Sequence, residues 1–113
     1  MGLFKKNKNK YNQYDEKSVA GITSFDNMYY IIVPTNTEEQ LLHITNTILN
    51  GRAVLANFTK LSSSDANSML AFIGGAVYAI GGQTYQIEPK LFLFARKEEY
   101  DDGSLYQYIE DTK

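Results

Sequence analysis

Few side chains in this sequence have a type and spacing suited to acid–base, nucleophilic or metal chemistry. The 113 residues contain no cysteine, which excludes a thiol nucleophile and a zinc–thiolate site. The single histidine is His43. With a helical rotation of about 100° per residue, it falls on the side of the expected helix opposite the apolar stripe of Leu41, Ile44 and Ile48. That position is typical of a surface histidine. No catalytic or metal-ligating residue is predicted, and the protein is not expected to be an enzyme.

The carboxylates and serines also have ordinary explanations. Glu38–Glu39 stand at the start of an expected helix, where acids favour the helix dipole. Glu98–Glu99 and Asp101–Asp102 are expected to form a solvated acidic run. Ser62–Ser64 is expected to cap a helix, because no G-x-S-x-G motif accompanies it.

Two glycine pairs bracket the stretch GGAVYAIGG at residues 74–82. A dinucleotide-binding loop requires G-x-G-x-x-G between a strand and a helix, and a P-loop requires G-K-S or G-K-T; neither is present. The first pair is expected to end a helix, and the second to form the tight turn of a β-hairpin. The glycines therefore predict turns, and no cofactor is expected.

Hydrophobic periodicity predicts an α/β domain with the order β-α-β-α-β-β-β. Two helices are expected, each starting with a capping spacing (Thr35 to Glu38, Ser62 to Asp65) and continuing with apolar residues at i, i+3, i+4 and i+7. They are expected to stop at Gly51 and at Gly74–Gly75. The runs expected to be strands are 28–34, 52–58, 76–80, 83–87 and 91–95.

The charge is unevenly distributed along the chain. Residues 1–14 hold four lysines and no acid, whereas the whole chain has a formal net charge of −2. We expect a basic N-terminal arm at 1–25, the α/β domain at 26–96 and an acidic tail at 97–113. No apolar run approaches the roughly 20 residues that span a bilayer, and the lysine-rich start lacks an apolar signal region, so a cytoplasmic location is expected.

Two helices are too few to cover both faces of a mixed sheet of about five strands. The apolar side chains of 91–95 alternate between the two faces. Each large side chain left in water would forfeit about 2 kcal/mol. A second copy of the sheet is therefore expected to cover the open face and form a homodimer. Alternatively, the arm or the tail folds back over it, using Tyr106, Tyr108 and Ile109.

Two other classes of function deserve comparison. Nine tyrosines among lysines would suit base stacking, but the body is acidic and the element order differs from β-α-β-β-α-β, so no nucleic-acid partner is expected. A small-molecule-binding regulatory α/β dimer is the alternative function. Such domains also stack helices on one face of a sheet, and turn glycines near an interface make room for a ligand.

From Val33 to Ala95 the sequence resembles SepF, a family of bacterial cell-division proteins. VPTNTEEQLLHITNTILNGRAVLANFTKL resembles the family's first strand, first helix and G-x-x-V second strand. ANSMLAFIGGAVYAIGGQTYQI resembles its second helix and the F-x-x-G and V-Y-A motifs, and KLFLFA its last strand. Phe72 to Gly82 is the most specific part. The short arm, and Arg96 in place of a proline, depart from the family pattern.

The resemblance implies a dimerising, self-assembling domain that binds the C-terminal tail of FtsZ, the tubulin-like division protein. It also implies an N-terminal amphipathic helix that ties FtsZ filaments to the membrane. The expected location is then the division site, peripheral on the inner face of the cell membrane. Leu3 and Phe4 are expected to enter the lipid interface, while Lys5 and Lys6 meet anionic lipid.

Specific residues are expected to serve assembly and peptide binding. Gly75 is expected where the second helix meets the third strand, so that a bulky side chain there would obstruct packing. The residues expected at the self-association interface are Gly75, Val77, Tyr78, Phe92 and Phe94. Spacing does not locate the peptide site, and the residues assigned to it as a hypothesis are Phe72, Tyr78 and Ile80.

Overall fold

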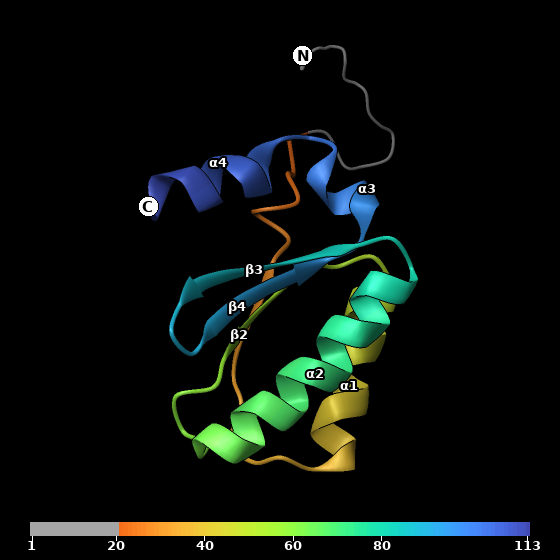
Figure 1. Cartoon of the computed structure of the whole chain (residues 1–113). Helices are drawn as coiled ribbons and strands as arrows, with labels where there is room; N and C mark the ends of the chain where they lie inside the picture. Colours follow the sequence, from red (N-terminus) through yellow and green to blue (C-terminus); the bar gives the residue numbers. More distant parts are fainter. Residues whose placement is uncertain (1–20) are drawn as a thin grey trace.

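The computed structural model describes residues 21–113, which form a β-sheet with helices on both sides (Figure 1). The strands are β1 (Tyr29–Ile32), β2 (Val54–Asn57), β3 (Gln83–Glu88) and β4 (Leu91–Ala95). The helices are α1 (Glu38–Leu49), α2 (Ser63–Ala79), α3 (Lys97–Tyr100) and α4 (Ser104–Asp111).

The strands lie in the order β1-β2-β4-β3. β1 and β2 are parallel, as expected for strands joined through a crossover helix, and the other two pairs are antiparallel. Val54 pairs with Tyr29 on one side and with Phe94 on the other. The α/β class and the mixed sheet are confirmed. The expected count of five is not, because the sheet of residues 21–113 has four strands.

The strand expected at 76–80 is wrong, because α2 continues through the first glycine pair. Ser62 caps the helix as expected, its hydroxyl accepting a hydrogen bond from the Asp65 amide at 3.1 Å. The helix then runs for 17 residues, and the buried stripe of Met69, Ile73 and Val77 extends past Gly74–Gly75. The two helical glycines together cost about 1–2 kcal/mol relative to alanine, which the roughly 1.5–3 kcal/mol gained by burying Val77 offsets.

The second glycine pair ends α2 instead of forming a hairpin turn. Gly81 has a φ of 81°, the left-handed conformation typical of a helix C-terminus. The Gly82 amide donates to the Val77 carbonyl, and the Gly81 amide to that of Tyr78, as in a Schellman motif. The cap of α1 lies two residues later than expected: the hydroxyl of Thr37, not that of Thr35, accepts from the Gln40 amide.

One face of the sheet, here called the first face, is covered by α1 and α2, as expected (Figure 1). Both helices contribute their apolar stripes to this core, and the strands contribute every second residue. Its fully buried members include Ile44, Ile48, Val54, Phe58, Met69, Ile73 and Phe94.

The opposite, second face is covered by the C-terminal helices α3 and α4 (Figure 1). Of the acidic run expected to be solvated, Glu98, Asp101 and Asp102 are exposed and Glu99 is buried; the alternative, a tail folded back over the sheet, is confirmed. The tail is amphipathic: its apolar side chains face the strands while most of its acids stay in water. Because the chain covers this face itself, the argument from an open face no longer requires a second copy. The packed residues are Ala53, Leu55, Leu93, Ala95, Tyr100, Leu105 and Ile109.

Polar contacts fix the tail in place. Arg96 donates to both carboxylate oxygens of the buried Glu99, at 2.8 and 2.7 Å. The Ser24 amide donates to Asp102 at 2.8 Å and joins the start of the domain to the tail. Tyr100 is buried, and burial raises the pKa of its hydroxyl, which donates to the Gln83 carbonyl at 2.8 Å. The tail is thus an integral part of the fold.

We predict that Leu105→Ala lowers the free energy of unfolding by about 2–5 kcal/mol, because Leu105 is fully buried under α4. Leu42→Ala, at a position 45% exposed on α1, is the matched control and should change it by about 0.5 kcal/mol or less. Urea denaturation followed by circular dichroism measures both. Similar small losses in the two variants would contradict the packing of α4 on the sheet.

Candidate functional site

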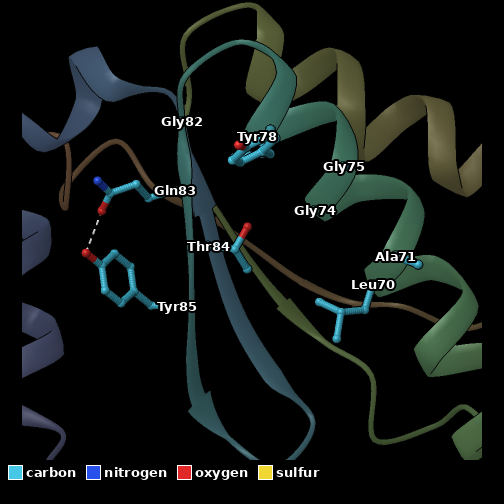
Figure 2. A pocket seen from close by; sticks show the side chains of 10 residues that line it. Leu70, Ala71, Gly74, Gly75, Tyr78, Gly82, Gln83, Thr84 and Tyr85 are labelled. Atoms are coloured by element: carbon cyan, nitrogen blue, oxygen red, sulfur yellow. Dashed lines mark hydrogen bonds between the residues drawn. The ribbon is translucent and has the colours of Figure 1, made fainter.

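A groove of about 580 Å³ lies between α2 and the edge strand β3 (Figure 2). It exists because Gly74 and Gly75 place no side chain in the space between helix and strand. None of its lining residues carries a charge. They are Leu70, Ala71, Gly74, Gly75, Val77, Tyr78, Gly82, Gln83, Thr84 and Tyr85.

The interior of this α2–β3 groove is mostly apolar. Val77 is buried at its base, and the side chains of Leu70 and Thr84 point into the space between helix and strand (Figure 2). Tyr78, in the last turn of α2, is 83% exposed. An exposed tyrosine beside an apolar hollow offers a large rigid contact area and one hydroxyl, which suits recognition of a peptide.

The other side of the groove is an edge of the sheet. β3 pairs only with β4 among the strands of residues 21–113, so every second residue turns its backbone N–H and C=O away from the sheet. An extended peptide can add to such an edge through main-chain hydrogen bonds, while neighbouring pockets take its side chains. The geometry therefore suits a short peptide with apolar side chains.

Residues of the tail support β3 from behind. Gln83 and Tyr85 point away from α2 (Figure 2), and the Tyr85 hydroxyl donates to the Gln83 side-chain oxygen at 2.5 Å. The rings of Tyr100 and Tyr106 lie 5.8 and 6.2 Å from that of Tyr85. Burial, together with its neighbour Tyr106, raises the pKa of Tyr85. These contacts fix one side of the groove.

The glycines at the groove differ in what the fold requires of them. A Cβ on Gly82 would overlap the Ala95 carbonyl oxygen and crowd Val77, so only glycine fits where β3 begins. A Cβ on Gly75 would meet no atom within 4 Å, and Gly75 has no positive φ. The folding of one chain therefore does not require glycine at position 75.

The structure separates the residues expected at the self-association interface. Gly75 and Tyr78 are exposed and line the groove. Val77, Phe92 and Phe94 are buried in the core of the first face, which places them inside the chain rather than on a surface that a second copy could reach. Gly75 lies inside α2, and not at a junction with a third strand as expected.

The residues assigned to peptide binding are divided in the same way. Tyr78 lines the groove, whereas Phe72 and Ile80 are exposed but do not line it. Sequence reasoning missed most of the lining because it placed a strand at 76–80. The continuing stripe of Met69, Ile73 and Val77 was the available signal. The expected membrane residues lie outside the described part of the chain: Leu3, Phe4, Lys5 and Lys6.

A second hollow, of about 570 Å³, lies near the end of α1 and the start of α3, but its charged groups already have partners. Arg96 pairs with Glu99, and Asp102 accepts from the amides of Ser24 and Ser104. Within residues 21–113 no group of three or more histidine or acidic side chains is arranged to hold a metal ion. No helix in this range is long and apolar enough to cross a membrane.

Comparison with known proteins places this fold in a family. The profile of a family described as "Cell division protein SepF" matches residues 30–98, more than half of the chain and all of the residues that line the groove. The "Cell division protein SepF" of Lactobacillus gasseri is 29% identical over 105 residues, which cover 93% of this chain and 70% of that protein.

Proteins of the same description match over a shorter range in two other species. In Lacticaseibacillus casei the identity is 36%, and in Lactobacillus helveticus it is 31%, each over 67 residues. These alignments cover 59% of this chain but only 44% and 46% of those relatives. The profile match over the sheet, both large helices and the groove shows that this chain belongs to the SepF family of cell-division proteins.

Proposed function

We propose that this protein is a non-enzymatic cell-division scaffold that self-associates, binds the C-terminal tail of FtsZ and helps to tether FtsZ filaments to the membrane during septum formation. The observation that carries the proposal is an uncharged groove beside a strand edge that no other strand of residues 21–113 covers, inside the part of the chain that matches the SepF family. FtsZ enters as the partner that the family resemblance implies. Repetition of one weak peptide site along an assembly would multiply its strength.

The FtsZ tail is proposed to bind in the α2–β3 groove. The backbone of β3 would hold the tail as an added strand, and Leu70 and Tyr78 would contact its apolar side chains. Because the groove has no charged lining residue, most of the affinity would come from apolar burial and main-chain hydrogen bonds.

We predict that Gly74→Phe weakens binding of an FtsZ tail peptide at least tenfold, because the ring fills the groove. The added Cβ meets no atom within 4 Å, so the fold is expected to persist. Gly74→Ala is the control that leaves the groove open. Fluorescence anisotropy measures peptide affinity, and a pull-down compares FtsZ with and without its last residues. Equal retention of both forms of FtsZ would contradict the proposal.

Self-association is proposed to use the outward side of α2. Phe72 and Tyr78 are large and exposed there. Gly75 leaves a position between them without a side chain, although the fold of a single chain does not require glycine at that position. A small residue in a helix lets a second backbone approach closely. Burial of two exposed aromatic side chains per copy would supply the driving force.

We predict that Gly75→Lys lowers the size of the assemblies while the circular-dichroism spectrum stays that of the folded protein. The lysine would place a charge and a long side chain in the contact. Gly75→Ala, the matched control, should fold at least as stably, because alanine is favoured in helices by about 1 kcal/mol. Analytical ultracentrifugation gives the result, and unchanged sedimentation of the lysine variant would contradict the proposed surface.

Membrane contact is proposed for the N-terminal arm. Leu3 and Phe4 would enter the lipid interface, and Lys5 and Lys6 would contribute about 1 kcal/mol each near an anionic surface. We predict salt-sensitive binding to vesicles that contain anionic lipid, and loss of binding in a chain lacking residues 1–10. Co-sedimentation with vesicles tests this, with neutral vesicles as the control. Equal co-sedimentation of the full and shortened chains would remove the arm from the mechanism.

A further inference from the structure

The strand β1 forms the other edge of the sheet and, within residues 21–113, pairs only with β2. The amides of Tyr29 and Val33 donate to the carbonyls of Ala53 and Asn57, both at 2.9 Å. In a parallel pair the bonding residues alternate along the strand. The N–H and C=O groups of Tyr30 and Ile32 therefore point away from β2, at the open edge.

The side chains of these two residues are also available for contact. Tyr30 is 50% exposed and Ile32 45% exposed. Both lie on the second face, where α3 and α4 cover the residues of β2 and β4 more fully than those of β1. The Asn57 side chain donates to the Tyr30 hydroxyl at 2.8 Å and holds its ring against the sheet. The apolar surface at this edge is thus ordered before any partner binds.

β1 is short, but it has neither a charge nor a register shift, two of the features that protect edge strands. Its sequence is YYII, and no charged residue occurs from Asn27 to Thr37. The opposite edge, β3, ends in Glu88 and has a register shift between Gln86 and Glu88. A charge and a bulge both hinder strand addition, and in β3 they lie beyond Gln83–Tyr85, the part of the strand beside the groove. Of the two edge strands, β1 is therefore the one without a charge and without a register shift.

We propose that β1 is a second self-association surface, to which β1 of another copy adds as an antiparallel strand. The twofold axis passes midway between the Ile31 residues of the two copies. This register places Tyr30 opposite Ile32 of the second copy, and Ile32 opposite its Tyr30. All four outward N–H groups then face outward C=O groups. Each of the two pairs joins an aromatic to a β-branched side chain, a favourable cross-strand combination. No like charges meet, because the segment has none.

This inference rests on the proposed self-association and adds the geometry of the assembly. A single twofold contact gives a closed dimer. Two different twofold contacts on one chain, the outward side of α2 and the edge of β1, instead link copies into an open chain. The partner at β1 is a second copy, because the edge is complementary to itself. In the antiparallel register each Tyr30 meets an Ile32, and no charge opposes the contact.

The test compares particle mass by analytical ultracentrifugation for the full chain and its variants. Ile32→Lys places a charge at the edge and should reduce the assemblies to dimers of twice 12.8 kDa, held through α2. Gly75→Lys should leave dimers held through β1, and the two changes together should give monomers. Ile22→Lys makes the same exchange at a position 51% exposed outside β1, and should assemble like the wild type.

Three results would overturn the proposal. They are wild-type assembly by Ile32→Lys, equal losses in Ile32→Lys and Ile22→Lys, and monomers from Gly75→Lys alone. The first two results do not concern the FtsZ site, since Ile32 does not line the groove and Ile32→Lys should bind the tail peptide as the wild type does. Loss of peptide binding in the wild type would instead count against the proposed function only.

Two further measurements protect the test against a variant that fails to fold. Combining Tyr30→Glu with Ile32→Lys in one chain places opposite charges across the twofold axis, and should restore the assemblies lost in Ile32→Lys. In the wild type, hydrogen exchange of the outward amides of Tyr30 and Ile32 should slow as the concentration rises. Slow exchange at all concentrations would mean that residues 1–20 of the same chain occupy the edge, and would overturn the proposal.

Discussion

The buried stripe of Met69, Ile73 and Val77 keeps α2 helical across two glycines, and the rest of the architecture depends on it. Since the helix consumes residues that would otherwise add a strand, the sheet stops at β3 and leaves that strand as an edge. The glycines inside the helix then leave the space beside β3 unfilled. The groove is thus a by-product of helix continuity, produced by apolar burial that outweighs the poor helix propensity of glycine.

The C-terminal tail completes the domain from the other side. The family match ends at residue 98, whereas α4 begins at Ser104, so the element that covers the second face lies beyond the matched region. Its apolar residues Leu105 and Ile109 close the core over Leu93. The ion pair of Arg96 and Glu99 fixes the angle at which the tail leaves β4. Coverage of this face by the chain itself leaves the helices and the strand edges as surfaces for other molecules.

Local rules predicted much of the fold and less of the groove. The stripe on α1, the Ser62 cap and the strands at β1, β2 and β4 follow from periodicity and capping, which act over a few residues. The end of α2 could not be fixed in this way, because both glycine pairs suit a helix terminus and only packing of Val77 decides between them. The sequence leaves two alternatives for the tail, because its acids are frequent while its apolar residues recur at helical spacing. The groove depends on both points and so escaped prediction.

The hydrogen bond from Tyr100 to the Gln83 carbonyl has a consequence for motion. Proteins open locally in cooperative units, and elements joined by buried contacts open together. This bond joins α3 to Gln83, the first residue of β3, and the ring of Tyr100 also contacts that of Tyr85 in the same strand. The C-terminal segment and the strand beside the groove are therefore expected to open together: detachment of the last helices would leave the start of β3 held by its pairing with β4 alone, however far the two are separated along the sequence.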